Sequence, residues 1–392
     1  MDARYFTLDN WMEPPFNRAA FQRVRELVPT ALIRNHSGHV NTLPYDRQPL
    51  DTLQYRGADG TGQVWGQHLA DSYCDAVCVV HQGRIVFEQY LNGMTAETPH
   101  LLMSVSKSFC GAALGISIGR GLVGADQLVC DIVPELAGTS LDGATVQHVI
   151  DMTAGTDFVE DYDLYDEPGS TSPLIEYERQ AGYRRLGARE PIGMLGHFRT
   201  YGTAYPHGEH FEYRSPLTNI AARIVEVVND MRYPDVVSRD LWGPLGQEHD
   251  ADIMLDPTGQ AVVEGGMSCT VRDLARLGLA YLGDGSVNGA PVVPTAWVDD
   301  TRLGTDAAVQ AFAVGDRESA ALGWSMYRNA FWVFERGEVF SGLGIFGQYC
   351  YVNRHTGTVI ARFSTYPSAV PEALSAETLA GFGAVAAHLV AS

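Results

Sequence analysis

Strand-like segments lie at both ends of this chain, and helical patterns fill the stretch between them. Residues 76–91, AVCVVHQGRIVFEQYL, have the composition of two strands around a Gln-Gly turn, which predicts a hairpin. Five further strand-like segments with short turns follow one another between residues 322 and 365. We therefore expect one antiparallel sheet built from both ends of the chain. The pattern indicates an α+β fold in which residues 1–120 and 270–392 form an α/β domain and residues 121–269 form a mostly helical inserted domain.

The chain carries a strong negative charge. Its 392 residues include 27 basic and 47 acidic ones, which gives a net charge of -20 at pH 7. Such a charge disfavours nucleic acid and anionic membranes as partners. The sequence has no run of about eighteen apolar residues, the length that a membrane-spanning helix needs. Its first residues also lack the pattern of a signal peptide. We therefore expect a cytoplasmic protein that binds a small molecule, with a homodimer as the default assembly.

The spacing of cysteine and histidine predicts neither a metal site nor another cofactor. The six cysteines are scattered and match neither a zinc site nor a C-x-x-C redox pair, so we expect free thiols. Two histidine pairs, His36 with His39 and His207 with His210, differ from the helical H-E-x-x-H pattern of zinc enzymes. We therefore expect any catalysis to use the protein's own groups, without a metal or an organic cofactor.

One lysine stands out from the other basic residues. Lys107 is the only lysine in the sequence, and it ends the motif Ser104-Val-Ser-Lys at the start of residues 105–119. That segment is small and apolar on nearly all sides, which predicts a buried helix. Residues three apart share a helix face, so the amine and the Ser104 hydroxyl should touch. A buried lysine can lose its proton, unlike arginine, and so activate a serine nucleophile. The alternative, a surface lysine beside a helix cap, fits poorly with the apolar neighbours.

A tyrosine and a glycine-rich strand accompany this motif. Tyr213-Arg-Ser lies directly before the helical segment 215–230 and could bring a phenol to the same site. Residues 341–348, SGLGIFGQ, contain G-x-G-x-x-G, but they lead into another strand. A dinucleotide-binding motif must instead open a helix. Glycines on a strand are typical of close backbone approach to a substrate. We expect the N–H groups of Ser104 and Ile345 to form an oxyanion hole.

Several motifs together resemble a known family. The segments HLLMSVSKS, VPELAG and SGLGIFGQ are similar to those of the 6-aminohexanoate-dimer hydrolases. These are nylon-oligomer amidases of the serine β-lactamase and penicillin-recognising superfamily. The resemblance implies a β-lactamase/penicillin-binding-protein-like fold with an antiparallel sheet flanked by helices, an inserted all-α domain, and a site between the two.

The resemblance also implies roles for individual residues. It implies an acyl-enzyme on Ser104, with Lys107 and Tyr213 as proton carriers. Tyr162 matches the tyrosine that hydrogen-bonds the scissile amide nitrogen in the family. We further expect the substrate to contact the edge strand at Gly344, Ile345 and Phe346.

The sequence departs from the family at positions that affect the substrate. Residues 342–344 are Gly-Leu-Gly where the superfamily usually has Lys-Thr-Gly, so no cation is placed to hold a β-lactam carboxylate. Glu264 replaces the family's asparagine, and no histidine follows Tyr366 near the site. An acidic Glu264 favours a cationic or amine-bearing substrate. The irregular stretch 157–206 is also expected to carry specificity.

The leading interpretation is a serine hydrolase of small linear amides or carboxylic esters. A transacylase that moves the acyl group to an amine would need the same acyl-enzyme and remains an alternative. A non-catalytic binding module on the same fold is a third possibility, against which the intact Ser104, Lys107 and Tyr213 set argues.

Overall fold

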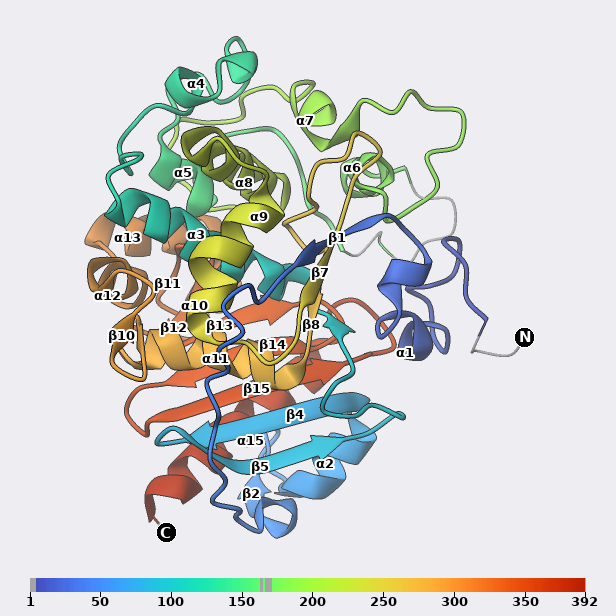
Figure 1. The fold of residues 1–392 in the computed structure, drawn as a ribbon, viewed down its shortest axis with the longest axis vertical. Helices are drawn as coiled ribbons and strands as arrows, with labels where there is room; N and C mark the ends of the chain where they lie inside the picture. Colours follow the sequence, from blue (N-terminus) through green and yellow to red (C-terminus); the bar gives the residue numbers. More distant parts are fainter. Residues whose placement is uncertain (1–4, 163–164, 166–170, 392) are drawn as a thin grey trace.

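The computed structural model describes residues 5–162, 165 and 171–391. Its largest sheet has seven strands in the order β11-β12-β13-β14-β15-β4-β5, and every neighbouring pair is antiparallel (Figure 1). The predicted α+β class, with strands from both chain ends in one sheet, is confirmed. The strands are β4 (Cys74–His81), β5 (Arg84–Tyr90), β11 (Met326–Arg328), β12 (Phe331–Glu335), β13 (Val339–Gly344), β14 (Gln348–Asn353) and β15 (Thr358–Ser364).

The strands from the N-terminal part and those from the C-terminal part of the chain meet where β15 pairs with β4. Ile360 lies opposite Val79 in this pairing, and β4 is buried from Cys74 to Val80. A strand that is covered on both faces is expected to be largely apolar, as β4 is apart from Asp75 and the terminal His81. The hairpin to β5 turns at Gln82 and Gly83, whose φ angles are 49° and 75°. Two positive φ values are typical of a type I′ turn, which explains the glycine.

Helices cover both faces of the sheet. On one face α2 (Trp65–Asp71) and α15 (Glu372–Ala391) pack through Trp65 and Phe382 against the apolar side of β4 and β15. On the other face α11 (Val271–Leu282) lies along β14 and β15. A Cβ on Gly278 would come within 2.5 Å of Val359, so this helix sits closer to the sheet than a larger residue allows.

The helical region above the sheet in Figure 1 is centred on α3 (Ser106–Gly119) and α8 (Pro216–Asn229), which pack together. Nearly every residue of α3 is buried, as predicted. The other helices are α1 (Asn17–Ala20), α4 (Val129–Ile132), α5 (Val146–Ile150), α6 (Pro173–Ala181), α7 (Gly193–Phe198), α9 (Tyr233–Val237), α10 (Gly243–Leu245), α12 (Thr295–Leu303), α13 (Asp306–Gly315) and α14 (Arg317–Ala321). Single helical turns are η1 (Val24–Glu26), η2 (Leu50–Thr52), η3 (Met103–Val105), η4 (Pro134–Leu136) and η5 (Ser238–Trp242).

A second, smaller sheet was not indicated by the sequence. Its strand order is β1-β7-β8-β6, and two of its strands come from the stretch that we expected to be mostly helical. Strands of two to four residues are too short to show a period of two. The strands are β1 (Thr30–Ile33), β6 (His100–Leu101), β7 (Ala251–Met254) and β8 (Met267–Cys269); separate hairpins pair β2 (Gln54–Arg56) with β3 (Gly62–Val64) and β9 (Ser286–Val287) with β10 (Ala290–Pro291).

Among the described residues, one helix is long and apolar enough to cross a membrane. It is α15, and a third of its most apolar window is buried inside the protein. Phe382 and Val385 of α15 belong to the core beneath the sheet. Core helices commonly pass the same length and composition test, so this finding is weak evidence for a span.

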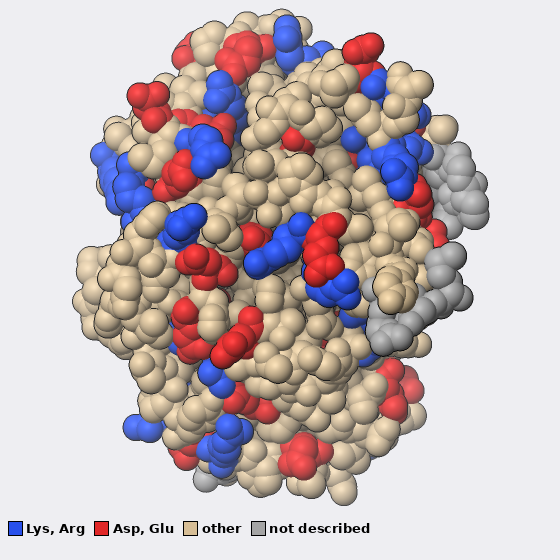
Figure 2. All heavy atoms as spheres, turned by 45° about the vertical axis from the view of Figure 1, so that its right-hand side comes forward, with Lys and Arg blue, Asp and Glu red and all other residues tan. Residues whose placement is uncertain are grey.

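Charged side chains of both signs are interspersed on the protein surface (Figure 2). Many arginines lie within ion-pair distance of a carboxylate, as in Arg189 with Glu176 at 2.6 Å and Arg302 with Asp299 at 2.7 Å. On the face shown, acidic and basic side chains therefore lie among one another, and neither sign forms one continuous area.

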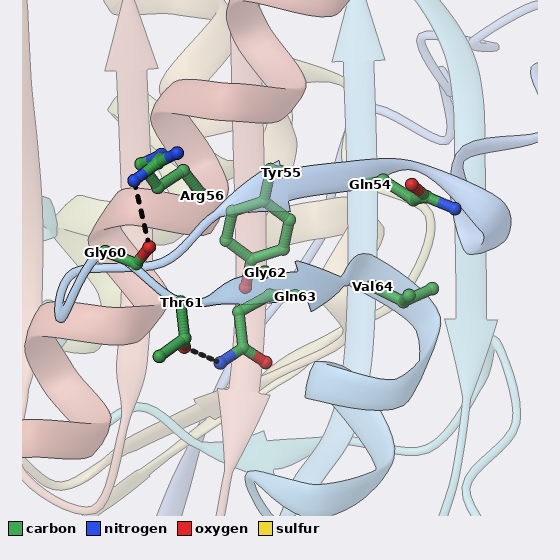
Figure 3. A pocket seen from close by; sticks show the side chains of 8 residues that line it. All are labelled: Gln54, Tyr55, Arg56, Gly60, Thr61, Gly62, Gln63 and Val64. Atoms are coloured by element: carbon green, nitrogen blue, oxygen red, sulfur yellow. Dashed lines mark hydrogen bonds between the residues drawn. The ribbon is translucent and has the colours of Figure 1, made fainter.

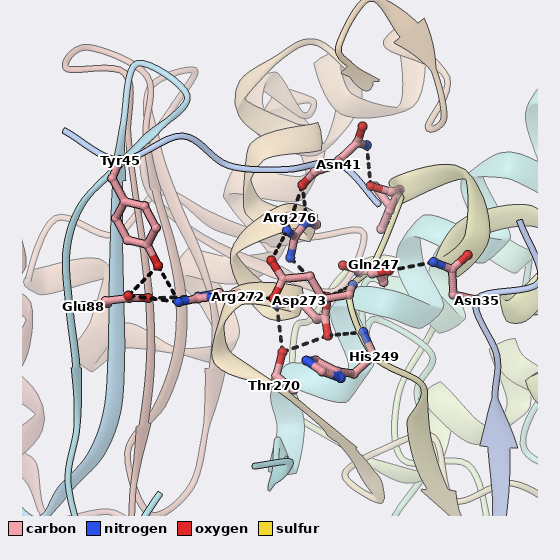
Figure 4. Close-up of polar contacts among 12 residues, drawn as sticks. Asn35, Asn41, Tyr45, Glu88, Gln247, His249, Thr270, Arg272, Asp273 and Arg276 are labelled. Carbon is pink, nitrogen blue, oxygen red and sulfur yellow. Dashed lines mark hydrogen bonds and ion pairs between the residues drawn. The ribbon is translucent and has the colours of Figure 1, made fainter. Parts of the chain in front are cut away.

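A buried polar network ties the N-terminal segment to α11 (Figure 4). The Arg276 side chain is fully buried and pairs with Asp273 at 3.2 Å and with Glu248 at 2.5 Å. Its guanidinium also donates to the carbonyl of Asn41 at 2.8 and 3.0 Å. Burial raises the pKa of Asp273, and the charge of Arg276 acts against that shift. Arg276 thus favours the charged carboxylate, together with the Glu248 N–H at 2.6 Å and the Thr270 hydroxyl at 2.8 Å.

Replacing Arg276 with methionine should destabilise the protein by about 3–5 kcal/mol, because Asp273 stays buried without its partner. The matched control is Arg336→Met, which removes an exposed pair with Asp306 and should cost less than about 1 kcal/mol. Urea unfolding of both variants measures the difference. Equal losses of stability in the two variants would show that the buried network stabilises the protein no more than the exposed pair does.

Candidate active site

Ser104 lies at the junction between the small sheet and α3. The backbone N–H of Leu102 donates to the carbonyl of Met267 at 2.8 Å, which fixes the chain just before η3. Met103 follows with a φ of 46°, a left-handed conformation that is rare for a residue with a long side chain. The helix α3 then begins at Ser106. The strained turn therefore presents Ser104 at the N-terminal end of a buried helix.

Lys107 lies in direct contact with Ser104. Its Nζ donates to the Ser104 Oγ at 2.8 Å and to the backbone carbonyl of Glu264 at 2.6 Å. The side chain is buried, with 1% of the residue exposed. Burial lowers the pKa of Lys107, while the negative charges of Glu160 and Glu264 act in the opposite direction. Burial therefore favours the neutral form of Lys107, which is the form that a general base requires.

Tyr213 is the third residue of this group. Its ring stacks on Trp332 with centroids 5.4 Å apart, and the Lys107 Nζ lies 5.2 Å from its ring centroid. Burial raises the pKa of Tyr213 well above its usual range, and a hydrogen bond to Ser104 acts against that shift. The phenol therefore holds its proton while it touches the serine. The structure brings together all three side chains that the sequence analysis singled out.

The end of β13 passes beside the serine. A Cβ on Gly344 would lie 3.1 Å from the Ser104 backbone nitrogen and 2.7 Å from the Leu102 carbonyl, so only glycine fits here without displacement. Within the described part of the chain, the N–H groups of Ser104 and Ile345 have no acceptor. Two unpaired N–H groups at neighbouring positions are suited to bind an oxyanion.

The Phe346 side chain is placed behind the pocket. It is buried and contacts the ring of Phe21 with centroids 5.3 Å apart. Its backbone N–H donates to the carbonyl of Ala369 at 2.8 Å. Phe346 thus supports the pocket wall, whereas Ile345, its neighbour, lines the pocket.

A narrow pocket opens at Ser104 and is lined by carboxylates and phenols. Its lining residues are Met103, Ser104, Glu160, Tyr162, Tyr165, Leu174, Glu178, Tyr183, Ser215, Glu264, Gly265 and Ile345. The sequence analysis expected Tyr162 and Glu264 here but missed Glu160, Glu178 and Tyr165. These three belong to the irregular stretch 157–206, where no motif or period marks an inward-facing residue. Only the expectation that this stretch carries specificity pointed to them.

Two of the three pocket carboxylates are fully engaged by neighbours. Glu160 accepts from the Ser215 N–H at 2.5 Å, the Ser215 hydroxyl at 2.7 Å and the Tyr162 hydroxyl at 2.5 Å. Glu178 accepts from the Tyr165 hydroxyl at 2.7 Å and pairs with Arg184 at 2.6 Å. The phenol of Tyr162 therefore points at Glu160 in this structure.

Glu264 is buried and is held chiefly by Asn219 of α8. The Asn219 side-chain amide donates to the Glu264 carboxylate, and its oxygen accepts from the backbone N–H groups of Val263 at 2.9 Å and Glu264 at 3.2 Å. Burial raises the pKa of Glu264, and the charge of Lys107 acts against that shift. Unlike Glu178, this carboxylate has no arginine partner in the described part of the chain.

A second hollow lies on the β2–β3 hairpin (Figure 3). Its polar contacts tie the hairpin to itself and to α15, as in Arg56 donating to the carbonyl of Gly60 at 3.2 Å and the Tyr55 hydroxyl donating to Glu377 at 2.8 Å. The described residues also contain no group of three or more His, Cys, Asp or Glu side chains arranged to hold a metal ion. The pocket at Ser104 is therefore the candidate active site.

Comparisons with known proteins agree with this geometry. A family model described as Beta-lactamase matches residues 67–384. The 6-aminohexanoate-dimer hydrolase of Paenarthrobacter ureafaciens is 36% identical over 370 residues, which cover 92% of this chain and 88% of that protein.

Solved structures show the same fold. A Bacillus anthracis protein described as a candidate 6-aminohexanoate-dimer hydrolase matches with a TM-score of 0.88 at 23% identity, over 98% of this chain and 97% of that one. A family VIII carboxylesterase matches with a TM-score of 0.55 at 14% identity, over 82% of this chain and 98% of that one. The fold and the resemblance predicted from the sequence are confirmed: this chain belongs to the Beta-lactamase family and, within it, to the relatives of 6-aminohexanoate-dimer hydrolase.

Proposed function

We propose that Ser104 is the nucleophile of an enzyme that cleaves small linear amides or carboxylic esters through an acyl-enzyme. The broad class, a serine hydrolase of amides or esters, follows from the family and from the 36% identity to a hydrolase. The observation that carries the residue roles is the 2.8 Å contact between the buried Lys107 Nζ and the Ser104 Oγ. A neutral amine there accepts the hydroxyl proton as the serine attacks.

Acylation uses all three side chains. The Ser104 Oγ bonds to the substrate carbonyl carbon, and Lys107 takes the hydroxyl proton. The carbonyl oxygen becomes an oxyanion that the N–H groups of Ser104 and Ile345 stabilise. Tyr213 then gives its proton to the leaving nitrogen or oxygen as the scissile bond breaks, and it regains a proton from Lys107. The free amine or alcohol departs, and the acyl group remains on Ser104.

Deacylation reverses this relay with water as the nucleophile. Water loses a proton to the tyrosine–lysine pair, attacks the acyl carbon and releases a carboxylic acid together with the Ser104 hydroxyl. A transacylase would use an amine in place of water. Product analysis with and without added amines separates the two outcomes, because only transfer gives a new amide.

The pocket supports a substrate that carries an ammonium group. Among the residues that the structure describes, no arginine pairs with Glu264, and the phenol rings of Tyr165 and Tyr183 lie in the same pocket wall. Carboxylates and aromatic rings together are typical of cation recognition. The relative named for the 6-aminohexanoate dimer supports the same substrate class. The Gly-Leu-Gly at residues 342–344 offers no cation for a β-lactam carboxylate, so β-lactam hydrolysis is not part of this proposal.

Replacing Lys107 with arginine should lower kcat by at least about 100-fold, because a guanidinium does not lose its proton and cannot act as the base. Circular dichroism and thermal unfolding establish that the variant is folded. A folded variant with an undiminished kcat would contradict the role of Lys107 as the base.

Replacing Gly344 with alanine should lower kcat by about 100-fold, because the new Cβ pushes the strand away from the Ser104 N–H and disturbs the oxyanion hole. The control is Gly383→Ala in α15, where a Cβ meets nothing within 4 Å. That variant should retain full activity. Comparable activity in both variants would exclude the proposed role of the strand.

The linear 6-aminohexanoate dimer is the first substrate to test, by release of free amine. Ser104→Ala should abolish release, and mass spectrometry of the native enzyme after rapid quenching should find the 6-aminohexanoyl group on Ser104.

Glu264→Gln should raise KM for the dimer about 10-fold or more, because the variant loses one charge-assisted contact with the substrate. The control substrate, N-heptanoyl-6-aminohexanoate, has a methyl group in place of the ammonium, and its KM should not change. An unchanged KM for the dimer would contradict ammonium recognition by Glu264.

A further inference from the structure

The inner wall of the pocket is supported by the N-terminal part of the chain. Three N-terminal residues share a buried hydrophobic cluster with two phenols that line the pocket: Trp11, Met12, Phe21, Tyr165 and Tyr183. The three N-terminal residues precede the region 67–384 that the Beta-lactamase family model matches. The shape of the pocket therefore depends on side chains from outside the matched region.

Trp11 holds Tyr183 by two contacts of different kinds. The indole Nε1–H donates a hydrogen bond to the Tyr183 backbone carbonyl at 2.9 Å. The two rings also stack, with centroids 6.1 Å apart and an angle of 10° between their planes. Trp11 is itself buried, with 1% of the residue exposed, and Phe21 packs edge to face against its indole at 5.8 Å. Both the backbone and the ring of Tyr183 are therefore fixed from behind.

Tyr183 lies between this N-terminal support and the nucleophile. A Cβ on Gly265 would lie 2.6 Å from the Tyr183 hydroxyl and 3.5 Å from the Met103 carbonyl carbon. Gly265 directly follows Glu264, and Met103 directly precedes Ser104. The phenol thus reaches the loop beside the catalytic serine and fills space that a longer substrate chain would need.

Met12 supports a second phenol that lines the same pocket. Its Sδ lies 3.2 Å from the Tyr165 hydroxyl, which also donates to Glu178 at 2.7 Å. Consecutive residues of the N-terminal segment thus pack behind two pocket phenols. In a closely packed pocket, one methylene more or less in the substrate changes binding strongly, so the position of this wall is expected to select among chain lengths.

We propose that Trp11 is a positioning residue that sets the length of the acyl chain this enzyme accepts, because it holds Tyr183 in place as the inner wall of the pocket. The inference rests on the proposed function, in which the acyl half of the substrate carries the ammonium group and lies beside Glu264. A smaller residue at position 11 leaves space behind Tyr183. The phenol can then move back, and the pocket lengthens for chains that the native protein excludes.

A positioning role of Trp11 differs measurably from a purely structural one. If Trp11 only stabilised the fold, its replacement would lower the amount of active enzyme for every substrate alike. If it sets the wall, its replacement changes the preference among acyl chains. The ratio of kcat/KM for two substrates on one preparation is independent of the folded fraction. This ratio therefore separates the two roles even in a destabilised variant.

The test uses the 4-nitroanilides of 6-aminohexanoic and 8-aminooctanoic acid, which share a leaving group and differ by two methylene groups. Trp11→Ala should raise the kcat/KM ratio of the octanoyl to the hexanoyl substrate about 10-fold or more, chiefly through a lower KM for the longer chain. Trp11→Leu leaves a smaller void and should shift the ratio in the same direction, so it serves if the alanine variant does not fold. Trp11→Phe keeps a ring against Tyr183 and should give a ratio between those of the native and Trp11→Ala proteins.

Trp65→Ala and Trp65→Leu are the matched controls. Trp65 is also fully buried, but it packs beneath the large sheet against Phe382, in a cluster separate from that of the pocket. These variants should lose stability and keep the native ratio. An unchanged or lower ratio in the folded Trp11 variants, or an equal rise in the Trp65 variants, would overturn the role of Trp11 alone. Failure of the native enzyme to cleave either anilide would instead overturn the proposed substrate class, and the inference about chain length with it.

Discussion

The burial of one amine is the constraint on which the rest of this site depends. A lysine ammonium in a protein interior is costly unless it is paired or loses its proton. Lys107 meets this cost with two acceptors, the Ser104 hydroxyl on its own segment and the carbonyl of Glu264, which lies 157 residues further along the chain than Lys107. The fold must therefore bring the start of α3 and the loop before β8 to the same point and keep water out.

The small sheet is what joins these two segments. Strand β6 ends just before the strained Met103, whereas β8 begins just after the Glu264 loop. These two strands pair directly with each other. The nucleophile and the acceptor that orients its base are thus anchored to adjacent strands. The large sheet supplies the third wall, because β13 brings Gly344 against the Ser104 nitrogen. Neither sheet alone would complete the site.

Sequence patterns predicted the large sheet and the Ser104, Lys107 and Tyr213 group because each leaves a local signal. Long apolar strands, a Gln-Gly turn and a lone lysine three residues after a serine are visible without a structure. The small sheet left no such signal, since its strands are too short to show alternation. Glu160 and Glu178 were missed for a related reason: where the sequence shows no clear pattern, a carboxylate that faces solvent and one that faces a pocket look alike, and Glu178 in fact lies on the short helix α6. Phe346 was expected at the substrate, but its side chain faces the core because the backbone turns there with a φ of 62°.

All but one of the Lys and Arg residues in this sequence are arginine, and this composition determines which reagents can modify the protein. Its only lysine side chain is enclosed by α3 and the Glu264 loop, so every cationic side chain at the surface is a guanidinium or an imidazole. Reagents that couple to lysine amines, and cellular enzymes that acylate or conjugate them, find no exposed lysine in this sequence. The one lysine amine is reached through the substrate pocket, so lysine modification of the folded protein would report on access to that pocket.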